Sequence, residues 1–120
     1  MPKFMLALRG NTAEWEALSA TEVETLMNHY RAWTDTLRQE GRFDSGSGLG
    51  GPSKRLEPAK KGAVGTTARV VDGPYVETKE ALTGYFMISA ESLDAAVEIA
   101  RGCPALLHGE TVEVIPAGGA

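Results

Sequence analysis

The stretch from Leu18 to Gly41, LSATEVETLMNHYRAWTDTLRQEG, limits the fold most because its pattern is that of one long amphipathic helix. Ser19 and Glu22 have the spacing of a capping box, in which a hydroxyl and a carboxylate each bind a free backbone amide at the start of a helix. Gly41 can adopt the left-handed conformation that ends many helices. Apolar side chains recur at helical spacing between these ends: Val23, Leu26, Met27, Tyr30, Trp33 and Leu37. We therefore predict a helix over residues 20–40.

Shorter apolar runs on both sides of this helix predict strands. They cover residues 3–8, 66–71, 84–90 and 111–115, and an irregular strand begins near residue 43 and runs into a glycine-rich loop. Ser92 can cap a second helix over residues 93–100, which Gly102 and Pro104 close. Residues 10–17 are expected to be a connection. Residues 53–65 are polar and are expected to form a projecting hairpin or a flexible arm.

The predicted elements follow the order β-α-β, then one or two extra strands, then β-α-β. This order predicts an α+β fold in one domain over residues 1–120. Two helices in such a chain can cover one face of an antiparallel sheet, which is the ferredoxin-like arrangement. A chain of 120 residues is long enough to bury a core of its own.

The second face of this sheet is expected to be partly apolar. Residues alternate between the two faces of a strand, so Phe86 and Ile88 share one face while Tyr85 and Met87 share the other, together with Met5 of the first strand. Leaving such side chains in water forgoes about 25 cal/mol per Å². We therefore expect a homodimer in which two sheets pack face to face. A monomer whose own loops fold over this face is the alternative.

Composition narrows the function classes. Apolar residues make up 42% and charged residues 23% of the chain, as in globular proteins. The net charge is -4 and no basic run exceeds Lys60-Lys61, which argues against nucleic-acid binding. The sequence has no stretch long enough to span a membrane and no signal-peptide pattern, so we expect a cytoplasmic protein that does not bind membranes. Two distant histidines and one cysteine predict no metal site, and no motif predicts a cofactor.

Five motifs in the second half of the chain resemble one known family. They are Asp72-Gly73-Pro74-Tyr75, Glu77-Thr78-Lys79-Glu80, Thr83-Gly84-Tyr85, Ser92-Leu93-Asp94 and Val112-Glu113-Val114-Ile115-Pro116. Together they resemble the DGPF-domain branch of the YCII-related family. The resemblance implies a ferredoxin-like subunit in a dimeric α/β barrel. It implies no settled reaction: members are described as possible enzymes, and some are associated with alternative sigma factors.

The same resemblance suggests a His–Asp pair as catalytic groups. His29 lies at the edge of the apolar stripe of the long helix, where a half-buried imidazole could act as a general base. Asp72 is the first choice for its partner because the Asp-Gly-Pro turn fixes its direction, and Asp44 is the second. A histidine with no task on the flank of the helix, and a purely structural turn, remain open alternatives.

The acidic and basic residues after the turn have two interpretations. Glu77 and Lys79 share one side of an extended segment and could form an exposed ion pair worth below about 1 kcal/mol. In a cleft, Lys79 would instead bind an anion and Glu77 would exchange protons. Tyr85, Met87, Met5 and Ser45 would then contact the ligand, although such residues on a sheet are often core. Cys103, at a helix C-terminus, is a poor candidate nucleophile.

Two functions follow from these residues. The first is a small-molecule-binding protein or acid–base enzyme that uses His29, Asp72, Glu77 and Lys79. The second is a non-catalytic interaction module, linked to transcription through the sigma-factor association. It is a dimer whose 53–65 arm and Asp-Gly-Pro turn bind a regulatory partner.

Overall fold

The computed structural model describes residues 1–62, 64–66, 68–73 and 81–118, and within these residues the chain has an α+β fold. Its elements are β1 (Lys3–Gly10), α1 (Thr12–Glu16), α2 (Ala20–Gln39), β2 (Phe43–Gly48), β3 (Ser53–Glu57), β4 (Arg69–Gly73), β5 (Ala81–Ser89), α3 (Leu93–Ala100), the 3-10 helix η1 (Pro104–His108) and β6 (Thr111–Ala117). No helix among these residues is long and apolar enough to cross a membrane.

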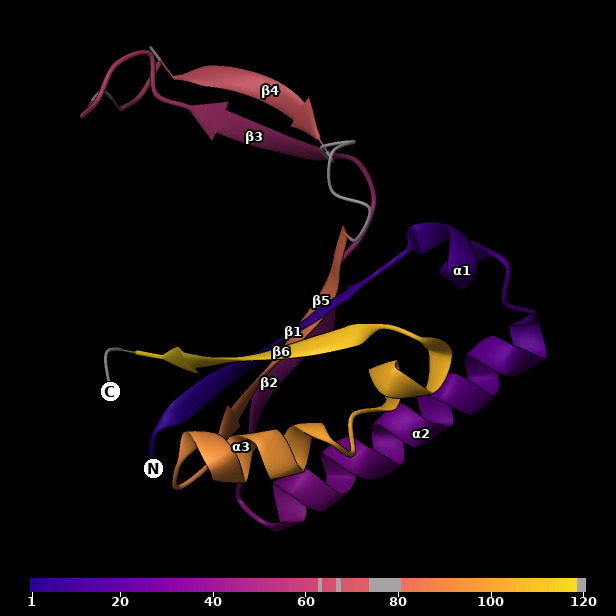
Figure 1. Cartoon of the computed structure of the whole chain (residues 1–120). Helices are drawn as coiled ribbons and strands as arrows, with labels where there is room; N and C mark the ends of the chain where they lie inside the picture. Colours follow the sequence, from indigo (N-terminus) through magenta and orange to yellow (C-terminus); the bar gives the residue numbers. More distant parts are fainter. Residues whose placement is uncertain (63, 67, 74–80, 119–120) are drawn as a thin grey trace.

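The main sheet has four antiparallel strands in the order β2-β5-β1-β6. The helices α2 and α3 lie on one face of it (Figure 1). The antiparallel sheet and the two covering helices agree with the α+β class predicted from the sequence.

The predicted division of the sheet into two faces is confirmed. Phe4, Leu6 and Ile88 are buried against the two helices, where Leu37 of α2 and Ala96 of α3 meet them. The alternate residues Met5, Tyr85 and Met87 lie on the face away from the helices and are half-buried. We call this second side of the main sheet the open face.

Both predicted ends of α2 are present. The Ser19 hydroxyl accepts from the backbone N–H of Glu22 at 3.1 Å, and the Glu22 carboxylate accepts from the Ser19 N–H at 3.1 Å. At the other end Gly41 has φ 71°, and its N–H donates to the Arg38 carbonyl while Arg42 N–H donates to the Leu37 carbonyl. This pair of bonds is a Schellman motif, which satisfies carbonyls that a helix end leaves free.

Replacing Ser19 by alanine is expected to lower the free energy of unfolding by about 1 kcal/mol, because it removes one half of the capping box. Urea unfolding followed by circular dichroism measures this. Thr25→Ala, at an exposed position of the same helix, is the control and should stay within about 0.5 kcal/mol of the wild type. Equal stability of the Ser19 variant and the control would contradict the role of the cap.

Two short elements differ from the sequence prediction. The expected connection over residues 10–17 contains α1, which the Asn11 side chain caps by accepting from the Ala13 N–H at 2.9 Å. After α3 the chain does not pass directly to β6 but first forms η1, which starts at Pro104 and ends at Gly109 with φ 85°. One-turn helices are set by caps rather than by periodicity, so a search for apolar periodicity misses them.

The strands β3 and β4 form a separate two-stranded sheet, and this hairpin projects away from the main sheet and the helices (Figure 1). The radius of gyration is 16.7 Å, whereas a compact chain of this length has about 14 Å. The predicted projecting hairpin is therefore present. Its strands are β3 and β4, and β4 overlaps the strand that the sequence placed at 66–71.

Candidate functional site

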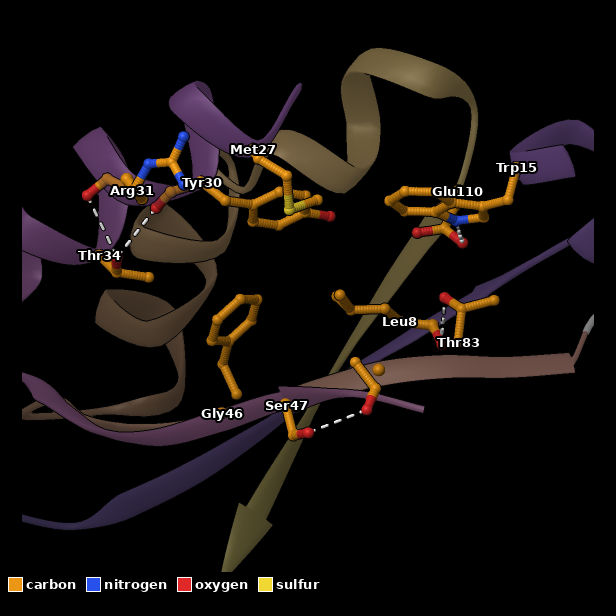
Figure 2. A pocket seen from close by; sticks show the side chains of 13 residues that line it. Leu8, Trp15, Met27, Tyr30, Arg31, Thr34, Gly46, Ser47, Thr83 and Glu110 are labelled. Atoms are coloured by element: carbon orange, nitrogen blue, oxygen red, sulfur yellow. Dashed lines mark hydrogen bonds between the residues drawn. The ribbon is translucent and has the colours of Figure 1, made fainter. Parts of the chain in front are cut away.

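A cavity of about 290 Å³ lies between α2 and the main sheet, on the side that the helices cover (Figure 2). Its wall is largely apolar, and its polar groups come from α1, α2, β2, β5 and the residue before β6. The lining residues are Leu8, Trp15, Met27, Tyr30, Arg31, Thr34, Gly46, Ser47, Gly48, Thr83, Gly84, Phe86 and Glu110. A mainly apolar cavity with a few polar groups is typical of small-molecule sites.

Phe86 forms the centre of an aromatic cluster beside the cavity. Its ring stacks on Tyr30 with centroids 5.9 Å apart, and it meets the Trp33 ring edge-on at 5.0 Å. Gly46 of the neighbouring strand leaves room for this ring, because a Cβ at Gly46 would lie 2.4 Å from Phe86 Cδ1. Gly46 thus helps to shape the wall.

One end of the cavity holds a buried carboxylate. The Glu110 side chain is 1% exposed, and its Oε2 accepts from the Trp15 indole Nε1 at 3.1 Å. Its Oε1 lies 3.5 Å from Nε2 of His108, whose side chain is 13% exposed. The Trp15 and His108 rings meet edge-on at 4.9 Å. We call Trp15, His108 and Glu110 the Glu110 cluster.

Glycines at two positions allow Glu110 to be buried. Gly109, with φ 85°, ends η1 in a conformation that L side chains rarely adopt, and it directs the chain into β6. Gly10, on β1, would bring a Cβ within 2.6 Å of Glu110 Cγ if it were alanine. The carboxylate therefore occupies space that a side chain at position 10 would fill.

The carboxylate is not fully satisfied by the residues that the structure describes. Among these, neither Glu110 Oε1 nor His108 Nε2 has a hydrogen bond within standard geometry, although the two atoms lie 3.5 Å apart. Buried carboxylates need hydrogen-bond donors or a cation to offset lost hydration. A small tightening would let the two groups share a proton, so the pair can act as an acid and a base.

Two further buried groups stay protonated near neutral pH. Burial, together with the charges of Cys103 and Glu110, raises the pKa of the Tyr30 hydroxyl well above its ordinary value. Figure 2 shows the Tyr30 hydroxyl directed toward the end of the cavity where Glu110 lies. Burial also raises the pKa of the Cys103 thiol to about 11, which agrees with the view that it is a poor nucleophile.

The structure places the predicted base away from its predicted partners. His29 lies on α2 and is exposed, not half-buried as expected, and it borders a groove with His108. Asp72 is on β4 of the projecting hairpin, where it accepts from Lys54 at 3.0 Å, and Asp44 pairs with Lys3 at 3.6 Å. Within one chain His29 therefore has neither aspartate beside it, and its catalytic role stays a prediction.

Several predicted site residues lie outside the described residues. Glu77 and Lys79 are among them, and so is Pro74 of the predicted turn, of which the structure describes Asp72 and Gly73 as the end of β4. Their proposed roles also stay predictions.

The four predicted ligand contacts do lie together, but not at the cavity. Met5 pairs with Met87 across β1 and β5, Ser45 pairs with Met87 across β2 and β5, and Tyr85 follows on the same side. All four are half-buried on the open face, whereas the cavity is on the helical face.

Sequence reasoning missed the Glu110 cluster. Trp15 and Glu110 are 95 residues apart, and no spacing rule joins them. The one feature of the sequence that could have pointed to this cluster is His108-Gly109-Glu110, in which a single glycine separates an imidazole from a carboxylate. Within the described part of the chain no three His, Cys, Asp or Glu side chains are grouped closely enough to hold a metal ion.

Comparison with known proteins places the chain in a family. An uncharacterized protein of Rhizobium meliloti (strain 1021) is 45% identical over 56 residues, which cover 42% of this chain and 44% of the relative. The match thus spans less than half of that curated relative. The model of the YCII-related domain matches residues 4–117, from the second residue of β1 to the end of β6. The chain therefore belongs to the YCII-related family.

Proposed function

We propose that this protein binds a small organic molecule in the cavity beside the Glu110 cluster and exchanges a proton with it. The single observation that carries the proposal is the buried Glu110 carboxylate, which borders the cavity and has one oxygen without a hydrogen bond among the described residues. This proposal replaces His29 and Asp72 by His108 and Glu110 as the acid–base pair.

The chemistry of the wall defines the class of ligand. An ionised carboxylate only accepts hydrogen bonds, so the matching group on the ligand is an N–H or O–H donor. The rings of Tyr30, Phe86 and Trp15 border the cavity and favour a flat, largely apolar body. A volume of about 290 Å³ is at the lower end for ligand sites, which fits a molecule of one or two rings.

The proton exchange follows from the pair of groups. Glu110 lines the cavity, whereas His108, whose Nε2 lies 3.5 Å from Glu110 Oε1, lines the separate groove that His29 borders. Glu110 can take a proton from the ligand, and a neutral His108 can accept that proton in turn, which restores the carboxylate. Tyr30, which keeps its proton, can donate a hydrogen bond to an acceptor on the ligand.

Benzamidine and benzoate test this proposal. Each has a single aromatic ring, but benzamidine donates hydrogen bonds whereas benzoate accepts them. Benzamidine is expected to bind and to shift the Trp15 indole N–H signal in nitrogen–proton correlation spectra, where the two tryptophans give two indole signals. Glu110→Gln should weaken benzamidine at least tenfold, about 1.4 kcal/mol, because a neutral amide replaces the buried carboxylate.

The matched control is Glu113→Gln, the same substitution at an exposed position of β6, and it should leave benzamidine affinity unchanged. A preference for benzoate would mean that Arg31, which also borders the cavity, governs binding, and it would contradict the proposal. Equal affinity of wild type and Glu110→Gln would contradict it as well.

We also propose the assembly that the sequence suggested: a ferredoxin-like subunit that pairs with a second copy through the open face as a dimeric α/β barrel. The strand order β2-β5-β1-β6 supports the subunit fold. If the strands of the main sheet are numbered along the chain, so that β1, β2, β5 and β6 are strands 1 to 4, they lie side by side in the ferredoxin-like order 2-3-1-4. Half-buried Met5, Met87 and Ile115 in neighbouring strands support the pairing. A protein that is monomeric in sedimentation experiments would contradict it.

An interaction module is the second candidate function. Its supporting observation is the projecting β3–β4 hairpin, which exposes apolar side chains and does not border the cavity. The association with sigma factors that the resemblance implied stays a prediction, and co-purification with a sigma factor would test it.

A further inference from the structure

The β3–β4 hairpin has two different faces. The register pairs Lys54 with Asp72 and Leu56 with Val70, and because alternate residues share a face, these four side chains lie on one side. Arg55, Glu57 and Arg69 lie on the other side, where Glu57 accepts from both arginines at 2.6 and 3.3 Å. We call the side with Leu56 and Val70 the apolar side of the hairpin.

This apolar side is open to solvent. Leu56 is 65% exposed and Val70 is 59% exposed, although they are directly opposite each other and form a continuous apolar patch. Of the nine exposed large apolar side chains among the described residues, four lie in the short segment 49–70. A two-stranded hairpin is marginally stable in water unless a hydrophobic face packs against something else.

The charge of the hairpin indicates what covers it. Residues 49–73 contain five basic and two acidic side chains, whereas the remaining sequence contains seven basic and fourteen acidic ones. The hairpin is therefore positive and the rest of the chain is strongly negative. Complementary charge favours contact between such surfaces, and in a dimer each copy supplies both.

We infer that the β3–β4 hairpin is an arm that packs its apolar side, Leu56 and Val70, against the body of a second copy of this chain. The inference rests on the pairing of two copies proposed above. The arm projects beyond its own sheet (Figure 1). In a twofold dimer this contact would form twice, once for each arm. The arm then gains the packing that it lacks within its own chain.

Sedimentation equilibrium of three full-length variants tests the arm. Leu56→Asp places a charge on the apolar side and is expected to raise the dimer dissociation constant at least tenfold. The control is Leu107→Asp, the same substitution at a leucine that is 66% exposed outside the hairpin, and it should change the constant less than twofold. Met87→Lys, on the open face, is expected to weaken the dimer independently of the arm.

A mixed sample gives direct evidence of contact between copies. Equal amounts of methyl-labelled and unlabelled protein are combined, and isotope-filtered nuclear Overhauser spectra then report contacts between chains only. Leu56 and Val70 methyl groups are expected to show such contacts. Raising the ionic strength to about 1 M, where the Debye length is about 3 Å, should weaken the dimer by screening the charges.

The outcomes separate the two proposals. If Met87→Lys dissociates the dimer but Leu56→Asp does not, and the arm shows no contacts between copies, the pairing stands and the arm inference is wrong. If the wild-type chain is a monomer, both are wrong. Contacts of Leu56 with another protein, and none with a second copy, would overturn the inference in favour of an interaction module.

Discussion

The Phe86→Ala variant is expected to unfold about 3 kcal/mol more easily than the wild type and to lose the shape of the cavity. Phe86 packs between the rings of Tyr30 and Trp33 and also approaches the Phe43 ring at 6.4 Å. Removing a ring of this size leaves a void that its neighbours fill only partly, and Phe→Ala changes of this kind cost about 3–5 kcal/mol. The lower value applies because Phe86 is half-buried.

Urea unfolding measures the loss of stability, and titration with benzamidine measures how the affinity of the cavity for a ligand changes. Binding should weaken in Phe86→Ala because the ring is part of the wall. A variant as stable as the wild type, or one that binds benzamidine unchanged, would show that the aromatic cluster does not hold the cavity in place.

A double-mutant cycle tests whether the Phe86 ring is in contact with position 46 of β2. Gly46→Ala would bring a Cβ within 2.4 Å of the Phe86 ring and is expected to cost about 1–3 kcal/mol by overpacking. In a Phe86→Leu background the same alanine should cost less, because the smaller side chain can move aside. Strictly additive effects would mean that the two positions do not interact.

The fold was accessible from the sequence where local signals and burial agree. The helix α2 was predicted within one residue because its caps and its apolar stripe point to the same ends. The alternation along β1 and β5 identified the buried face, since Phe4, Leu6 and Ile88 share one parity and are all buried. These patterns depend only on neighbours within a few residues.

The candidate site was less accessible because tertiary structure creates it. The indole of Trp15 reaches Glu110 because α1, which no periodicity marks, follows β1 and brings the ring to the residue before β6. Glu110 is a single acid among sixteen acidic residues, and its burial depends on the space that Gly10 leaves. The residue types at the open face were predicted to contact a ligand, whereas the cavity lies on the opposite face.

The two faces of the sheet therefore have different tasks in our proposals. The helical face contains the apolar cavity with a proton-exchanging carboxylate, and the open face provides the surface for a second copy. A residue such as Met87 affects assembly in this arrangement, and a residue such as Glu110 affects binding. Variants that separate the two effects are hence the most informative ones.

The free energy of unfolding is expected to fall by about 2 kcal/mol between pH 9 and 11 because of Cys103. Burial raises the pKa of the thiol from 9.0 to about 11 in the folded chain, so above pH 9 the unfolded chain releases this proton while the folded chain still holds it. A raised pKa of this kind contributes stability that is fully present below the unfolded pKa and is lost as the pH rises through the folded one. Tyr30, whose pKa is also raised, adds a loss of the same sign at higher pH.

Urea unfolding at a series of pH values from about 8 to about 11, for wild type and Cys103→Ala, isolates the effect of the thiol. The variant loses a buried side chain and starts less stable, but its stability should fall less steeply above pH 9, and the remaining slope should shrink further in Cys103→Ala/Tyr30→Phe. The comparison of slopes cancels the lysines that titrate in every variant. Parallel curves for wild type and Cys103→Ala would mean that the thiol is hydrated in the folded chain, and the packing of Cys103 against Leu8 and Ala105 beside the cavity would have to be revised.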